Sequence, residues 1–118
     1  MKWDNPYVSV QSKIESLERW LLVHAIIYYE YNNNIVTDTQ WDTNAYQLVD
    51  MIKQYPKDFK ASYYYILYKE FDGSTGFDLP DGLKEWNREH YDYLDIIASH
   101  VVYRSDKGNG KKVAKKEK

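Results

Sequence analysis

The chain has 118 residues and a formal net charge of −2, and 43% of its residues are hydrophobic, a share that excludes wholesale disorder. It contains no cysteine, so it can form neither a disulfide framework nor a thiolate metal site. From Lys107 onward there are six lysines and one glutamate, whereas the preceding residues carry 10 basic and 17 acidic groups. Such an acidic body is a poor match for nucleic acid, so we expect any nucleic-acid contact only through the lysine-rich end.

Thirteen tyrosines and four tryptophans are the unusual part of the composition. Their rings combine a large apolar area with a polar edge, which suits half-buried or ligand-facing positions. A core that uses tyrosine in place of leucine is the structural alternative. The first residues lack the apolar region of a signal peptide, and no apolar run approaches the roughly 20 residues of a membrane span. We therefore expect a cytoplasmic protein without a membrane partner.

The first predicted helix runs from about Val8 to Tyr31. Its apolar residues recur at three- and four-residue steps along one stripe: Ile14, Leu17, Leu21, Ala25 and Tyr28. Three asparagines, residues 32–34, then predict a chain reversal, because asparagine tolerates left-handed backbone.

The second predicted helix opens at Thr37. Thr37 and Gln40 have the spacing of a capping box, in which each side chain satisfies a free amide of the first turn. An apolar stripe follows and Pro56 lies just beyond its end; the stripe consists of Trp41, Ala45, Leu48 and Ile52.

Two further helices are predicted. One runs from Asp58 or Lys60 to about Phe71 through "YYYILYKE", a run that also has the composition of a strand. After a loop, the other runs from Pro80 to about Tyr103, with Leu83, Trp86, His90, Leu94, Ile97 and Val101 on one face. The prediction is an all-α fold: a compact four-helix bundle with an N-terminal helical hairpin, forming one domain over residues 1–105, and a flexible basic tail over residues 106–118.

The common catalytic motifs are missing from the sequence. His24, His90 and His100 are dispersed and show no metal-binding spacing, and no phosphate-binding or nucleophile motif is present. "KEFDG" at residues 69–73 resembles the lysine motif of covalent nucleotidyltransferases, but its spacing is one residue too long. We therefore predict no metal site and no enzyme.

The stretch "YYEYNNNIVTDTQWD", residues 28–42, is the candidate site. Asp38 and Asp42 are four residues apart, so their carboxylates share one face of the second helix, beside Trp41. Tyr28 and Tyr29 end the preceding helix, and a helical hairpin can bring their rings opposite the acids. Rings attract flat cationic heterocycles and carboxylates accept hydrogen bonds from sugar hydroxyls, so the set suits a nicotinamide nucleotide. Two solvated acids on a helix face are the structural alternative.

This stretch resembles the N-terminal Ia domain of NAD-dependent bacterial DNA ligases, which has the pattern Y-(H/Y)…D-x-E-Y-D between two helices. The resemblance covers about residues 10–56. It implies that Tyr28 stacks on nicotinamide and that Asp38 and Asp42 contact the amide and the ribose of nicotinamide mononucleotide (NMN). Trp41 stands where the family has tyrosine and Tyr29 where it usually has histidine; Gln40 replaces a glutamate and Asn34 a proline.

The other domains of a ligase do not fit in 118 residues, so the resemblance implies a stand-alone, non-catalytic module of phage or mobile-element type with no required cofactor. Two hypotheses follow. One is a module that acts by binding a host or phage protein, with a nicotinamide nucleotide as an optional second ligand. The other is a dedicated NMN or NAD sensor or accessory subunit. An acid–base role for Asp38 and Asp42 would require burial that drives their pKa values apart.

Overall fold

The computed structural model describes residues 9–33 and 35–106, and all of its regular structure is helical. The helices are α1 (Val10–Glu30), α2 (Asp38–Gln54), α3 (Pro56–Lys60), α4 (Tyr65–Tyr68), α5 (Leu79–Trp86) and α6 (Arg88–Asp106). The all-α prediction is confirmed. Asp106, the first residue of the predicted tail, is the last residue of α6. The rest of that tail and the residues before Ser9 lie outside the described residues, so the predicted domain boundaries stay a prediction.

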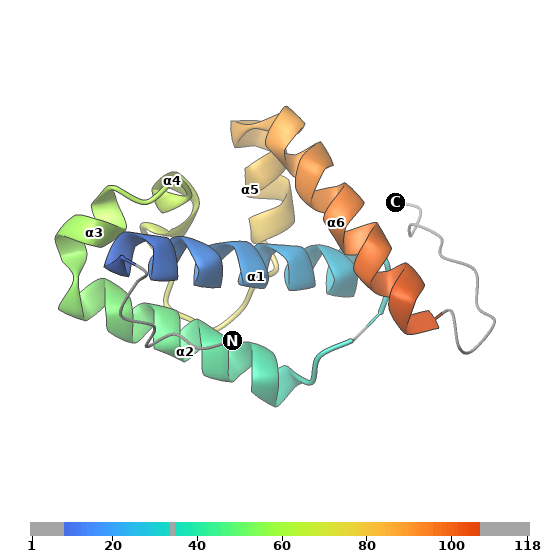
Figure 1. Cartoon of the computed structure of the whole chain (residues 1–118), viewed down its shortest axis with the longest axis horizontal. Helices are drawn as coiled ribbons and strands as arrows, with labels where there is room; N and C mark the ends of the chain where they lie inside the picture. The colour runs from blue at the N-terminus through green and yellow to red at the C-terminus, as the bar shows by residue number, and fades with distance from the viewer. Residues whose placement is uncertain (1–8, 34, 107–118) are drawn as a thin grey trace.

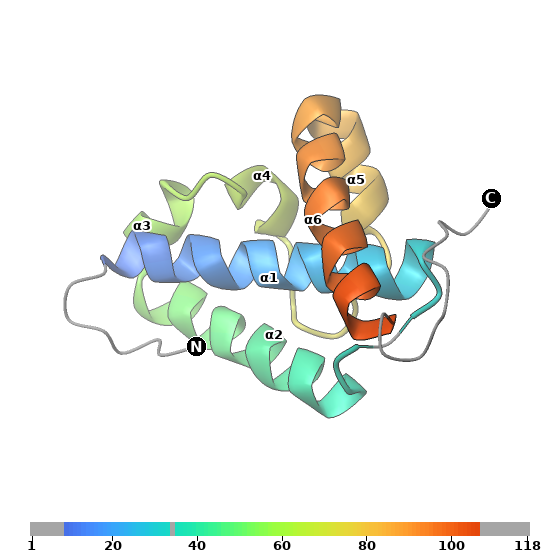
Figure 2. The same ribbon diagram turned by 45° about the vertical axis from the view of Figure 1, so that its right-hand side comes forward.

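Helix α1 is the centre of the fold (Figure 1). It contacts α2, α3, α5 and α6, and α2 runs antiparallel beside it as the predicted hairpin. Helices α5 and α6 form a second antiparallel pair, and α6 crosses the C-terminal half of α1 at a steep angle (Figure 2). Most of the predicted stripes of α1 and α2 form the core, with Ile14, Leu17, Leu21, Ala25, Ala45 and Leu48 buried and Trp41 and Ile52 partly buried. The prediction is wrong for Tyr28, which is 49% exposed.

The turn between α1 and α2 has the predicted chemistry. Asn32 adopts a left-handed φ of 51°, and the Asn33 N–H donates to the Ile27 carbonyl, so the end of α1 is capped. The Thr37 hydroxyl accepts from the Gln40 N–H, and the Gln40 side chain accepts from the Thr37 N–H, which completes the capping box. Asn34 lies outside the described residues.

The predicted third helix is interrupted and appears as α3 and α4. A continuous helix would direct the Tyr63 N–H to the Phe59 carbonyl, but the Ser62 hydroxyl occupies that carbonyl at 2.7 Å. The Tyr63 N–H instead donates to the Glu15 carboxylate of α1 at 2.8 Å. A contact between segments 48 residues apart thus ends the helix, and periodicity cannot predict it.

The predicted fourth helix also divides, at Asn87, so the four predicted helices become six helical segments in the described part of the chain. Asn87 has an extended φ of −156°, and its side-chain oxygen accepts from the His90 N–H, which caps α6. The break shifts the apolar face of α6. The buried residues of this helix are Tyr91, Leu94, Ala98 and Val102, whereas Trp86 is 37% exposed.

Within the described ranges, no helix is long and apolar enough to cross a membrane.

One carboxylate is buried in the core without a cation. Glu18 is fully buried, its Oε2 accepts from the Ser62 hydroxyl at 3.2 Å, and its Oε1 has no partner among the described residues. Burial raises the pKa of Glu18 to about 8; the Ser62 hydrogen bond opposes this shift, and the neighbouring Glu15 charge adds to it. Glu18 is therefore mostly protonated in the folded protein at neutral pH.

We predict that the protein loses stability as pH rises from about 4.5 to about 8. A raised carboxyl pKa means that the fold favours the protonated form, so the stabilisation is complete below the unfolded value of 4.5 and is lost through the folded value of about 8. Glu18→Gln should raise the free energy of unfolding at pH 7 by roughly 3 kcal/mol and flatten this dependence. Urea unfolding at several pH values measures both effects.

Glu85→Gln is the matched control, because Glu85 is exposed on α5, and it should leave the pH profile of stability unchanged. A wild-type protein that gains stability between pH 5 and pH 8 would contradict the prediction.

Candidate functional site: a pocket between the hairpin and the 72–78 loop

A pocket of about 280 Å³ lies where the α1–α2 hairpin meets the loop of residues 72–78. All five predicted site residues line it: Tyr28, Tyr29, Asp38, Trp41 and Asp42. Ten further described residues complete the lining; they are His24, Ala25, Ile27, Asn33, Ile35, Val36, Thr37, Ser74, Thr75 and Gly76. The fold therefore brings the predicted residues together in one open cavity, an arrangement that the helical hairpin makes possible.

Two tyrosines of the last turn of α1 supply an aromatic wall. The rings of Tyr28 and Tyr29 meet edge to face with centroids 4.8 Å apart, and Tyr29 makes a similar contact with Phe77 at 5.5 Å. Tyr28 is 49% exposed, so its ring is not consumed by packing. The Tyr29 hydroxyl lies 3.5 Å from the Thr75 hydroxyl and links this wall to the loop.

Trp41 lines the pocket, and two contacts fix the position of its ring. Its indole N–H donates to the Leu21 carbonyl at 3.4 Å, and its ring meets Phe71 edge to face. Trp41 is the half-buried first residue of the apolar stripe of α2. It therefore has a structural role as well as a place in the lining.

Asp38 and Asp42 stand one turn apart at the start of α2, and both are exposed. Within the part of the chain that the structure describes, neither carboxylate has an ion pair or a side-chain hydrogen bond. Asp38 also has a local structural reason to be there, since a negative charge in the first turn is favoured by the helix dipole. Asp42 lies beyond that turn and has no such reason. The burial that an acid–base pair would need is lacking at both positions.

His24 is a lining residue that sequence reasoning set aside. Its ring packs against Trp20 with centroids 4.4 Å apart, and its Nδ1 atom is buried with no partner in the described residues. Burial lowers the pKa of His24, so its imidazole is neutral at pH 7. The periodic position of His24 on α1, one turn before Tyr28, was the signal that could have placed it here.

The loop that closes the pocket was not part of the predicted site. Asp72 folds it locally, because its carboxylate accepts from the N–H and the hydroxyl of Ser74 at 2.9 and 2.6 Å. These bonds hold the pKa of Asp72 below its usual value. The loop then passes over Trp41 at Gly76, where a Cβ atom would lie 2.7 Å from Cζ2 of the indole. Only glycine lets the loop approach the ring this closely.

No family model matches the chain, and no curated protein or solved structure matches it either. The chemistry of the pocket has to come from its own residues. They offer aromatic rings, two carboxylates without a side-chain partner among the described residues, and the hydroxyls of Ser74 and Thr75. The described residues contain no cluster of histidine, aspartate and glutamate that could hold a metal ion.

We predict that Gly76→Ala distorts the pocket and destabilises the fold. The added methyl would overlap Trp41, whose ring is anchored at Leu21 and Phe71, so the loop must move. Overpacking of this kind costs about 1–3 kcal/mol, measurable by urea unfolding. The indole N–H signal of Trp41 in an NMR spectrum should shift as well.

Gly82→Ala is the control. Its Cβ would meet only Leu67, at an ordinary 3.5 Å, and it lies inside α5, where alanine favours helix by roughly 0.5–1 kcal/mol. A Gly76→Ala protein as stable as wild type, with an unmoved Trp41 signal, would show that the loop does not depend on this approach.

Proposed function

We propose that this chain is a non-catalytic module that binds the nicotinamide-ribose part of a nicotinamide nucleotide, NMN or NAD, in the pocket at the hairpin corner. The observation that carries the proposal is that Tyr28, Tyr29, Asp38, Trp41 and Asp42 share one cavity. Their order and spacing are those of the ligase Ia domain, and α1 and α2 form the antiparallel hairpin on which that pattern lies. We infer on this basis a relationship to Ia domains.

The chemistry of the lining supports this ligand class. The half-exposed ring of Tyr28 can offer its face to a flat cationic heterocycle, and the indole of Trp41 lines the same cavity. The exposed carboxylates of Asp38 and Asp42 can accept hydrogen bonds from ribose hydroxyls and from an amide, and they attract the positive ring. A volume of about 280 Å³ lies just below the usual range for ligand pockets, about 300–1,000 Å³, so it suits a nucleoside-sized group better than a whole dinucleotide.

The roles of these residues are binding roles, so the nucleotide is a ligand to be sensed or held and not a cofactor consumed in a reaction. An accessory subunit or a sensor is the form of action that this chemistry favours. The hairpin itself supplies the two walls of the pocket, and the 72–78 loop supplies the third.

We predict that NMN perturbs the NMR signals of the hairpin corner at up to millimolar concentration, and that Tyr28→Ala and Asp42→Asn each weaken binding at least tenfold. The first variant removes the stacking face, and the second removes a charge and an acceptor. Both residues are exposed, so the fold should survive either change.

Tyr103→Ala and Asp50→Asn are matched controls, since both side chains are exposed and lie outside the pocket lining. Titrations that show no binding of NMN, of NAD or of their shared nucleoside, nicotinamide riboside, would contradict the proposal.

A second candidate function, binding to a host or phage protein, is favoured by an aromatic patch on another face. The patch consists of Tyr63, Trp86, His90 and Tyr93, from the turn before α4 and from α5 and α6. Tyr63 meets the rings of Trp86 and His90 at 5.3 and 5.0 Å, and three of the four side chains remain more than a third exposed. Exposed Tyr and Trp rings held in fixed positions are typical of the residues that dominate protein interfaces.

We predict that the wild-type chain retains a stoichiometric protein partner from a host lysate and that a Trp86→Ala, Tyr93→Ala double variant loses it. The change removes two exposed rings from the patch and leaves the pocket intact. Tyr28→Ala, which alters only the pocket, is the control and should retain the partner. Recovery of the same partner with the double variant would count against the patch as the interface.

A further inference from the structure

The charge of the pocket is one-sided. Asp38 and Asp42 are its charged side chains, and the described residues that line it include no lysine or arginine. The described residues as a whole also carry more acidic than basic groups, sixteen against nine. Among the described lining residues, a ligand in this pocket therefore meets negative charge without a compensating cation.

The start of α2 does not reverse that charge. A free helix N-terminus attracts phosphate through its amides and its dipole, which is equivalent to about half a positive charge. Here the Gln40 N–H is taken by the Thr37 hydroxyl, and the carboxylate of Asp38 stands in the same turn. A full negative charge outweighs the dipole, so this helix end offers a phosphate little attraction.

His24 is no source of positive charge either. Its ring packs against Trp20, and burial lowers its pKa, so the imidazole is neutral at pH 7. At the position beside Tyr28, Tyr29 presents a neutral hydroxyl, which lies against Thr75. Because both groups are neutral, neither residue forms an ion pair with a phosphate dianion.

Resting on the nicotinamide-ribose function proposed above, we infer that the pocket selects a cationic pyridinium nucleoside without phosphate, of the nicotinamide riboside type, over the corresponding nucleotide. The positive ring gains from both the aromatic faces and the carboxylates. The 5′-phosphate of the nucleotide places two negative charges near the same carboxylates and finds no described cation in return. The protein would then respond to nicotinamide riboside rather than to its phosphorylated form, NMN.

The selectivity can be measured on the full chain by isothermal titration with three probes: nicotinamide riboside, NMN and the reduced, uncharged dihydro form of nicotinamide riboside. We expect the riboside to bind at least tenfold more tightly than NMN, a difference that equals about 1.4 kcal/mol. The reduced riboside should also bind more weakly than the cationic form, because it keeps the sugar and loses the ring charge.

Two further measurements test the cause of the selectivity. The preference for the riboside over NMN should shrink in 0.5 M NaCl, because salt screens exposed charges. It should also shrink in Asp42→Asn and stay unchanged in Asp50→Asn, whose site lies on α2 outside the lining.

NMN binding as tight as the riboside, or tighter, would overturn this inference and leave the proposed nicotinamide-ribose function standing. Equal binding of the charged and reduced ribosides would overturn the charge-based reason for it. Binding of none of the probes would overturn both the inference and the proposed function.

Discussion

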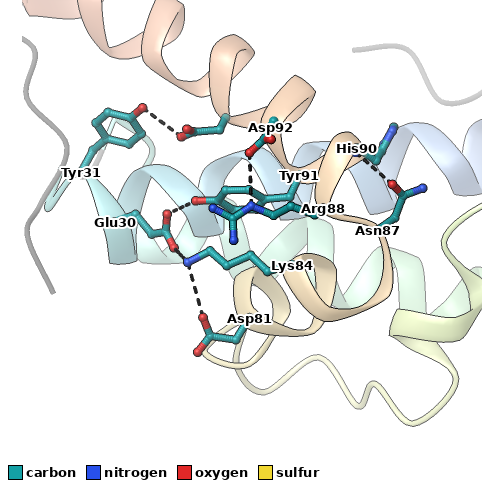
Figure 3. A network of polar contacts seen from close by, with 10 residues as sticks. Glu30, Tyr31, Asp81, Lys84, Asn87, Arg88, His90, Tyr91 and Asp92 are labelled. Atoms are coloured by element: carbon teal, nitrogen blue, oxygen red, sulfur yellow. Dashed lines mark hydrogen bonds and ion pairs between the residues drawn. The ribbon is translucent and has the colours of Figure 1, made fainter.

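The carboxylate of Glu30 is the point on which the rest of the structure depends. It is 2% exposed at the end of α1, and it accepts hydrogen bonds from the Lys84 ammonium of α5 and the Tyr91 hydroxyl of α6 (Figure 3). Lys84 and Arg88 also lie over the ring of Tyr91, at 4.9 and 5.5 Å from its centroid. Removing one partner of a buried ion pair leaves an uncompensated charge, which costs about 3–5 kcal/mol. The second helical pair must therefore stay docked on the end of α1, directly beside the aromatic wall of the pocket.

A second buried acid on the same helix, Glu18, is accommodated by protonation and not by an ion pair. Glu18 lies three turns earlier, among the segments that contain α3 and α4, and is kept neutral by burial instead of being paired with a cation. The Tyr68 hydroxyl adds a hydrogen bond to the Glu18 carbonyl at 2.7 Å. Helix α1 is thus tied near its middle by hydrogen bonds to the side chain and the backbone carbonyl of Glu18, and at its C-terminal end by the ion pair of Glu30 with Lys84. The same helix also packs against α2 to form the hairpin.

The pocket depends both on the hairpin of α1 and α2 and on the local hydrogen bonds of the 72–78 loop. The hairpin presents Tyr28, Asp38 and Asp42 on facing walls, and the turn of Asp72 and Ser74 shapes the loop that closes the third side. The side chains best suited to a ligand are the ring of Tyr28, which is 49% exposed although one edge-to-face contact with Tyr29 holds it, and the carboxylate of Asp42, which has no side-chain partner among the described residues. Trp41 and Tyr29 are shared between packing and lining. A ligand at this corner would contact α1, α2 and the loop together, so its binding would also stabilise their mutual arrangement.

The sequence by itself determined the features whose causes lie within a few residues. These are the apolar stripes of α1 and α2, the left-handed turn at Asn32, the capping box of Thr37 and Gln40, and the frame of candidate site residues from Tyr28 to Asp42. Periodicity and capping operate over one or two helical turns, so these features can be read directly. Only the tertiary structure decided the interruption after α3, the closure of the pocket by Gly76 over Trp41, and the states of Glu18 and Glu30. Each of these depends on contacts between residues tens of positions apart, such as Tyr63 with Glu15 and Tyr91 with Glu30, and no local pattern specifies which distant group a buried carboxylate or a free amide will meet.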